Sequence, residues 1–360
     1  MEKKTKKIVI ISLAVIFAMI IIFIIGSFIW YKMGIKPVQK EAGQVIRVEI
    51  EEGSGTVAIA ELLEQKQVIK SANAMKIYVK LNNIQSLQAG KYDLSNSEDL
   101  ATILTHIQNG EVVNEEVKIT FVEGKNMRSI AKTIADKTVN TEEDVFALLE
   151  DDEYIDSLIE KYWFLTDDIK NEAIYYPLEG YLLPDTYIFE NEEVSVKTIF
   201  NVMLNYMDKF LTANKEQITY NIHELITLSS ITELEGVQEE DRKEIIGVLL
   251  NRLNQRMSLG SDVTAYYAFK VDMGERDLYA KELKTENPYN TRGPNMEGKL
   301  PVGPICNPSK EAILATLNYT KTDNLYFVAD KNKKVYFTKT NEEHINLINQ
   351  LKEQGLWYEY

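Results

Sequence analysis

Two glutamates near the end of a predicted helix could carry acid–base chemistry. The segment 222–235 reads IHELITLSSITELE, and at about 100° per residue Glu233 shares a helix face with Ile226 and Ser229. Glu235 lies on a second, largely apolar face. Burial of a carboxyl on such a face raises its pKa and keeps it protonated near neutral pH, as a general acid requires. The pattern alone favours the alternative, an exposed glutamate near a helix end before Gly236.

A second motif, LEGYLLPDTY at 178–187, combines aromatic side chains with two acids, Glu179 and Asp185. Flat aromatic faces stack on sugar rings, and carboxylates accept hydrogen bonds from sugar hydroxyls. The motif therefore suits a carbohydrate site. Its composition alone favours a packed loop whose tyrosines belong to the core.

Polar residues recur in the segments that follow. Asn251 lies in a predicted helix whose apolar part is formed by Ile246, Val248, Leu249, Leu250 and Leu253. Asp262 lies in a GSDVT turn that leads to two tyrosines. The segment 287–292 (NPYNTR) is a polar loop, and 300–308 (LPVGPICNP) is too rich in proline for regular structure. Loops of this kind suit a sugar groove, although they also suit ordinary loop capping.

These candidates need elements to position them and a setting that allows their chemistry. The 360-residue chain has a net charge of −15, which disfavours nucleic-acid binding because that requires a basic surface. One cysteine, Cys306, excludes an internal disulfide. The three histidines lie far apart, so we expect no metal centre. Neither a Walker loop nor GxGxxG occurs, and no cofactor is expected.

The segment Ile8–Trp30 holds 23 residues without a charge, enough for a transmembrane helix. Lysines precede it, so the positive-inside rule predicts a cytoplasmic tail at 1–7 and an extracytoplasmic remainder. A cleaved signal peptide is the alternative, but the apolar stretch is long and no small-residue cleavage pattern follows. An extracytoplasmic location favours hydrolase, lyase or binding functions.

Two segments beyond the predicted linker at 31–43 resemble each other. Each has an alternating strand, then Glu-Gly, then a helix, at 46–65 and again at 117–136, with an offset of 71 residues. This indicates duplicated strand–turn–helix modules. A further strand is expected at 89–94, and the helix after it ends at Gly110. The acidic run 141–170 is interpreted as solvated helices.

Together, the motifs resemble the YceG-like family of endolytic murein transglycosylases. The family order is matched by EGYLLPDTY, SSITELE, VLLNRLNQRMSLGSDVT, ENPYNTR, LPVGPICNP, NLYFVAD and FTKTNEEH, over roughly residues 44–355. The departures are Val263, where the family often has proline, and Cys306, where small residues are common. The resemblance implies an α+β fold: a transmembrane helix at 8–30, a LysM-like module at 44–112, and a mixed, mostly antiparallel catalytic region at 113–360 that includes the second module.

The resemblance also implies the chemistry. Glu233 matches the single catalytic acid of the family. It would protonate the oxygen between N-acetylmuramic acid and N-acetylglucosamine and then deprotonate the 6-hydroxyl that closes a 1,6-anhydro ring. The remaining candidates are expected to bind substrate: Glu235, Glu179, Asp185, Asn251, Asp262, Tyr289, Asn290 and Thr291. The expected partners are peptidoglycan glycan strands, the cell membrane and penicillin-binding proteins.

Two other functions stay open on the sequence alone. A non-enzymatic wall-binding scaffold would not need Glu233, and a hydrolase would add water instead of closing a ring. Likewise, the first module either binds amino-sugar polymers or acts as a spacer between the membrane and the catalytic region.

Overall fold

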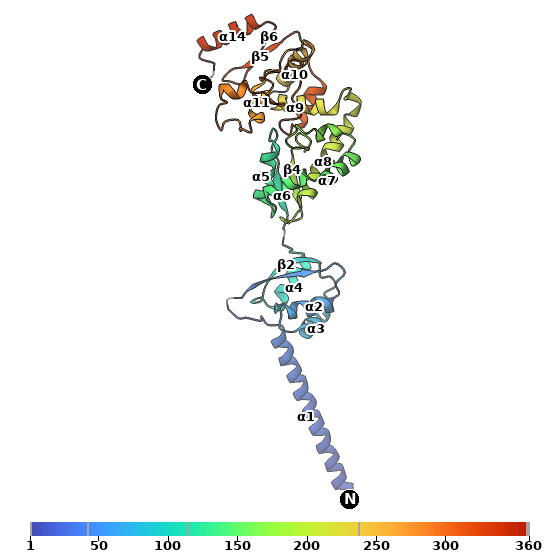
Figure 1. Ribbon diagram of the computed structural model, residues 1–360. Helices are drawn as coiled ribbons and strands as arrows, with labels where there is room; N and C mark the ends of the chain where they lie inside the picture. Colours follow the sequence, from blue (N-terminus) through green and yellow to red (C-terminus); the bar gives the residue numbers. More distant parts are fainter. Residues whose placement is uncertain (1, 42, 114, 237, 358–360) are drawn as a thin grey trace. The chain divides into compact units, whose positions relative to one another are not determined.

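The computed structural model of the chain describes residues 2–41, 43–113, 115–236 and 238–357 (Figure 1). It divides into two compact units, residues 1–114 and 115–360. Within the described residues, helices are combined with three two-stranded antiparallel sheets. The predicted mixed α+β class, with antiparallel strands and an apolar N-terminal helix, is thereby confirmed.

The first unit begins with one long apolar helix, α1, followed by a small α+β module. Within the described residues, the stretch Ile10–Gly34 of α1 is long and apolar enough to cross a membrane. The helix continues past Trp30, so the first residues of the predicted linker are helical. The elements are α1 (Glu2–Gly34), β1 (Val45–Ile50), α2 (Thr56–Gln65), α3 (Ala72–Leu81), β2 (Gly90–Ser95) and α4 (Leu100–Asn109).

The module folds around one hydrophobic core. β1 pairs with β2 in antiparallel register, from Val45 opposite Ser95 to Ile50 opposite Gly90. The inward side chains of this sheet pack against α2, α3 and α4. Gly110 follows α4 with a φ of 66°, a left-handed conformation that costs glycine little. The helix end predicted there is confirmed.

The first half of the second unit holds the second strand–turn–helix segment. β3 pairs with β4, from Val117 opposite Phe189 to Thr120 opposite Thr186. The acidic run folds as two α-helices and a 3₁₀ turn whose apolar faces join the core. The elements are β3 (Val117–Thr120), α5 (Met127–Lys137), α6 (Glu142–Leu149), α7 (Asp152–Lys161), η1 (Asp167–Lys170), β4 (Thr186–Phe189) and α8 (Val196–Ala213).

The second half is built around α9, whose bounds Ile222–Glu235 are those predicted. α10 begins earlier than the predicted apolar run, and Asp262 opens a helix where a turn was expected. The elements are η2 (Lys215–Gln217), α9 (Ile222–Glu235), α10 (Glu239–Asn254), α11 (Asp262–Ala268), α12 (Ala280–Leu283), α13 (Lys310–Leu317), β5 (Tyr326–Ala329), β6 (Val335–Thr338) and α14 (Asn341–Glu353).

α9 belongs to both hydrophobic cores of the second unit. Its first half, with Leu225 and Ile226, packs with α5–α8, whereas Leu228 and Ile231 pack with α10 and α11. Small polar residues let neighbouring segments approach this buried helix closely. For example, the Ser229 hydroxyl donates to the backbone of α9 and to Thr316 of α13. A helix buried on all sides fixes the direction of its last turn, where Glu233 lies.

Candidate functional site

A pocket of about 280 Å³ lies in the second unit at the end of α9. Its wall includes the turn between β3 and α5, residues 123–126, which is the second of the two repeated Glu-Gly turns. α11 contributes Tyr266 and Tyr267, and the segment 271–273 closes another side. Glu233 lines the pocket, so the predicted acid has a cavity beside it that a ligand can enter.

Three donor groups hold the carboxyl of Glu233, and the Glu233 side chain is only 8% exposed. Oε1 accepts from Nη2 of Arg242 at 3.0 Å. Oε2 accepts from the backbone N–H of Ser309 at 2.9 Å and from the Ser309 hydroxyl. Ser309 is also the N-cap of α13, so the carboxyl lies where that helix presents its unpaired N–H groups. The helix face predicted to be apolar is buried, with Ile226 in the core, whereas the contacts of the carboxyl itself are polar and come from other segments.

Gly124 packs directly against the acid. A methyl group added at this residue would lie 3.5 Å from Cγ of Glu233 and 3.2 Å from Cδ2 of Leu234. The φ of Gly124 is +71°, a conformation that side chains disfavour. Asn307 holds the turn from the other side, since its carbonyl accepts from the Gly124 N–H and its N–H donates to the Lys125 carbonyl. The turn thereby forms a fixed wall beside Glu233.

Glu179 lies beneath this wall and is 1% exposed. Its carboxyl accepts from the backbone N–H of Met127, the hydroxyl of Tyr267 and the side-chain amide of Asn307, at 2.9 to 3.0 Å. Burial raises the pKa of Glu179 to about 7, although these hydrogen bonds act in the opposite direction. In this structure Glu179 joins three segments around the pocket and does not face the cavity.

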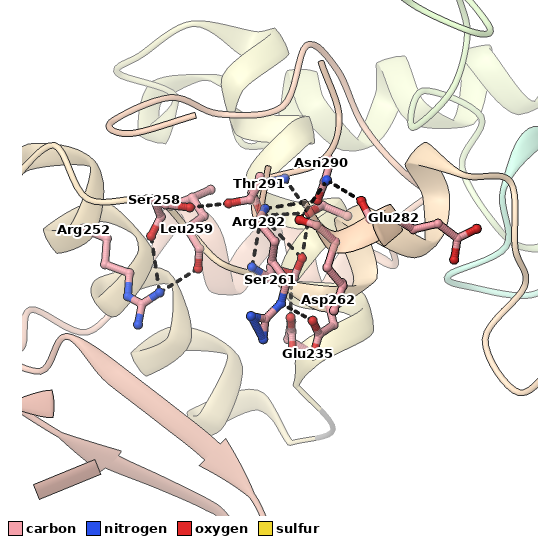
Figure 2. Close-up of polar contacts among 12 residues, drawn as sticks. Glu235, Arg252, Ser258, Leu259, Ser261, Asp262, Glu282, Asn290, Thr291 and Arg292 are labelled. Carbon is pink, nitrogen blue, oxygen red and sulfur yellow. Dashed lines mark hydrogen bonds and ion pairs between the residues drawn. The ribbon is translucent and has the colours of Figure 1, made fainter. Parts of the chain in front are cut away.

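Glu235 belongs to a second polar network, drawn in Figure 2. Its Oε1 accepts from the Ser261 hydroxyl at 2.6 Å, and the Ser261 N–H donates to the hydroxyl of Thr291 at 3.0 Å. Arg292 pairs with Asp262 in the same network. Burial raises the pKa of the Glu235 carboxyl, and the hydrogen bond from Ser261 opposes that shift. Glu235 is absent from the lining of the pocket beside Glu233.

The Pro-Tyr-Asn-Thr loop turns inward. Tyr289, Asn290 and Thr291 are fully buried. The Asn290 amide donates to backbone carbonyls of residues 282, 283 and 285, and the Tyr289 ring packs on two other tyrosines. These residues shape the loop, and their contact with substrate stays a prediction.

The remaining candidates lie apart from the pocket lining. The Asn251 amide donates to the carbonyls of Thr322 and Asn324, which attaches α10 to the segment before β5. Asp185 pairs with Lys310 at 3.3 Å, and each side chain is 40% exposed. Asp262, 57% exposed in its pair with Arg292, is the most accessible acid among the candidates.

Sequence reasoning missed three residues that organise the acid: Arg242, Ser309 and Asn307. Arg242 lies in the first turns of α10, and its Nε also donates to the Gly236 carbonyl at 3.0 Å. Ser309 is 76 residues from Glu233, and Asn307 is 128 residues from Glu179. In the sequence, Ser309 before the helical run KEAILATL is a recognisable helix-cap signal. No sequence pattern indicates that Ser309 also contacts Glu233.

The chain resembles characterised proteins along most of its length. The family model described as the YceG-like family matches residues 48–350. A Bacillus subtilis (strain 168) protein named endolytic murein transglycosylase is 36% identical over 333 residues, covering 91% of this chain and 90% of that protein. A Streptococcus pneumoniae (strain D39) protein of the same name is 33% identical over 329 residues. That alignment covers 86% of this chain, which spans 58% of the streptococcal protein.

A solved structure of a YceG-like protein from Listeria monocytogenes resembles this fold. The two chains are 36% identical, with a TM-score of 0.60, and the match covers 85% of this chain and 100% of the other. Sequence and fold therefore agree on the same family.

Proposed function

The chain belongs to the YceG-like family, and on that premise we propose that it is an endolytic lytic transglycosylase of peptidoglycan. The proposed reaction cuts the β-1,4 bond between N-acetylmuramic acid and N-acetylglucosamine inside nascent glycan strands. It leaves 1,6-anhydro-N-acetylmuramic acid and limits strand length. One observation carries the proposal: Glu233 lines a pocket and is held there by Arg242 and Ser309.

In the proposed mechanism, protonated Glu233 donates its proton to the bridging glycosidic oxygen as the bond to the sugar C1 breaks. Positive charge develops at C1. The 6-hydroxyl of the same sugar attacks C1, and Glu233, now a carboxylate, takes up the hydroxyl proton. The acid is thereby restored. One carboxyl suffices because the nucleophile is tethered to the sugar, whereas most glycosidases need a second carboxylate for water or a covalent intermediate.

Ser309 can serve both forms of the acid in this cycle. A hydroxyl donates to a carboxylate and accepts from a carboxylic acid, whereas a guanidinium only donates. We therefore propose that the Ser309 hydroxyl keeps a hydrogen bond to Glu233 in both protonation states of the acid. Arg242 is proposed to fix the position of the Glu233 side chain through Oε1.

The other candidates divide by accessibility. Asp262, Asp185 and Glu235 are at least partly accessible, and we assign them to the sugar groove or its border. Glu179, Asn251, Tyr289, Asn290 and Thr291 make contacts within the protein, and we assign them to hold the groove in shape.

We propose further that α1 spans the cytoplasmic membrane with residues 1–7 inside and the catalytic region outside, where its substrate lies. The module at 44–112 is proposed to be LysM-like, which its strand–helix–helix–strand order supports. Penicillin-binding proteins are the proposed protein partners, because a strand-cutting enzyme acts on the product of glycan synthesis.

The test is mass spectrometry of isolated glycan strands after incubation with the full chain in detergent. Internal fragments with 1,6-anhydro ends are expected from the wild type and not from Glu233→Gln. Reducing ends would identify a hydrolase instead. Equal cleavage by the variant would remove Glu233 from the mechanism. Absence of cleavage by either protein would favour a wall-binding scaffold.

A further inference from the structure

The segment around α3 has a charge balance opposite to that of the whole chain. Residues 65–92 contain no acidic residue in a protein of net charge −15. The lysines of this stretch are Lys66, Lys70, Lys76, Lys80 and Lys91. Such a local excess of positive charge attracts anionic surfaces even when the whole protein is acidic.

α3 also exposes apolar side chains beside these lysines. Leu81 is 69% exposed and Ile77 is 42% exposed, whereas Met75 and Val79 on the opposite side face the module core. Lys80 is exposed next to Leu81, and Lys76 pairs at 3.3 Å with Glu61 of α2. A helix with a buried face and an outer face of lysines and large apolar residues is typical of segments that lie on a membrane surface.

The module packs directly against the end of the membrane-spanning helix. The close approach of α1 to α3 leaves no room for a side chain at Gly34, where an added methyl group would lie 2.7 Å from Cβ of Ala74. The Leu100 N–H donates to the Ile35 carbonyl at 3.1 Å, and Ile35 packs against the module core. Figure 1 shows α3 beside this end of α1.

α3 contacts the last turn of α1. A methyl group added at Gly34 would lie 2.7 Å from Cβ of Ala74 and 3.4 Å from Cβ of Ser71, both at the start of α3. Tyr31, one turn earlier in α1, interacts with Tyr78. α3 therefore lies at the level of residues 31–34 of α1.

That level is the membrane interface. Ile10–Gly34 is a 25-residue stretch of about 38 Å, whereas the hydrocarbon core is about 30 Å thick. Shared between the two ends, the excess of about 8 Å places Trp30 and Tyr31 at the edge of the hydrocarbon core, where such aromatic residues concentrate, and the last residues of α1 among the lipid headgroups.

We infer that the outer face of α3 docks on the membrane that α1 spans, with Ile77 and Leu81 entering the interface and Lys70 and Lys80 contacting anionic phospholipid headgroups. The inference rests on the membrane-spanning part of the proposed function, not on its chemistry. Covering these side chains with lipid would fix the orientation of the module on the membrane.

The test uses the full chain reconstituted in vesicles, with an environment-sensitive fluorophore on Leu81→Cys. Cys306 stays in place because it is 1% exposed and therefore shielded from labelling. Val112→Cys is the matched control. Val112 is an exposed valine of the same unit and follows the C-terminal end of α4, whereas Leu100, which bonds to Ile35, lies at the N-terminal end. Ile20→Cys, in the middle of α1, reports whether the helix spans the bilayer.

Spin-labelled lipids with the label near the headgroup should quench position 81 several-fold more than position 112. The difference should be larger in vesicles of equal parts phosphatidylglycerol and phosphatidylcholine than in phosphatidylcholine alone. It should shrink when Lys70→Glu and Lys80→Glu are added. Quenching at 81 no stronger than at 112 in either vesicle, with position 20 quenched by deep labels, would overturn the inference.

Two further outcomes are distinguishable. An absence of deep quenching at position 20 would overturn the membrane span together with this inference. Equal quenching at 81 in both vesicles would overturn the assignment of the lysines to anionic headgroups. Cleavage of glycan strands by the same preparations is measured separately, so a failure of the proposed reaction cannot be mistaken for either result.

Discussion

Arg242 and Glu233 form an ion pair in which Nη2 of the guanidinium lies 3.0 Å from Oε1 of the carboxyl. The side chain of Arg242 is only 14% exposed, and its Nε donates to the carbonyl of Gly236 at the end of α9. One residue therefore holds both the proposed acid and the helix turn that carries it.

Replacing Arg242 with Leu should lower kcat about 10- to 100-fold, because a displaced acid no longer reaches the glycosidic oxygen. KM should change little, and Arg242→Lys should restore part of the loss. Steady-state kinetics on purified glycan strands provide the measurement. Lys243→Gln is the control, since Lys243 pairs with Glu239 and Glu240 on the same helix. A large rise in KM with kcat intact would count against a positioning role.

Ser309→Ala removes both a hydrogen bond to Glu233 and the side-chain cap of α13. The lost cap should lower the free energy of unfolding by about 1 kcal/mol. Ser195→Ala removes a comparable cap, because the Ser195 hydroxyl accepts from the Thr198 N–H at the start of α8. We expect both variants to lose similar stability in thermal unfolding, and only Ser309→Ala to lose about tenfold in kcat. Equal kcat in the two variants would exclude the proposed role of Ser309.

Gly124→Ala tests the wall of the pocket. Alanine at a φ of +71° costs about 1 kcal/mol, and its methyl group would press on Leu234 beside the acid. Gly53 occupies the matching turn of the first module, with a φ of +80° and nothing within 4 Å of an added methyl group. Gly53→Ala should therefore show the same backbone cost without loss of cleavage. Cleavage assays of the two variants at equal folded concentration would reveal whether Gly124 matters to the site itself.

Glu179 should make stability depend on pH. Its pKa is about 7 in the folded protein and 4.5 ordinarily, so the unfolded chain releases this proton first as the pH rises. Stability is fully present below about pH 4.5 and is lost as the pH rises through about 7. At about 1.4 kcal/mol for each pH unit, the loss is about 3 kcal/mol.

Denaturant unfolding between about pH 4 and pH 8 would measure this loss. Glu179→Gln should flatten the dependence, because the amide does not titrate. It should also be less stable than the wild type at acid pH, since its NH₂ group would face the donor of Asn307. The same slope in both proteins would show that Glu179 is not the titrating group.

The sequence was a good guide wherever local patterns decide structure. The bounds of α9 and the two glycine turns follow from helical periodicity and turn chemistry, and the structure confirms them. The resemblance to a family led to Glu233, because the residue pattern alone favoured an exposed glutamate without a role.

The surroundings of the candidate site were harder to predict because they depend on long-range contacts. Asn290 was predicted to be a cleft residue, since polar loops often bind ligands, yet its amide donates to two carbonyls of α12 and to the carbonyl of Thr285. The contacts of Arg242 and Ser309 with Glu233 have no local signal, because the positions of α10 and α13 relative to α9 are set by packing.

The order of these residues along the chain has a consequence for biosynthesis. Glu233 is made first, and Ser309 follows 76 residues later, with α13 needed to present its N–H. A chain that ends before Ser309 therefore carries the acid without two of its three donor groups. With the proposed function and topology, cleavage should therefore arise only after nearly the whole chain has been exported, so that truncated copies stay inactive.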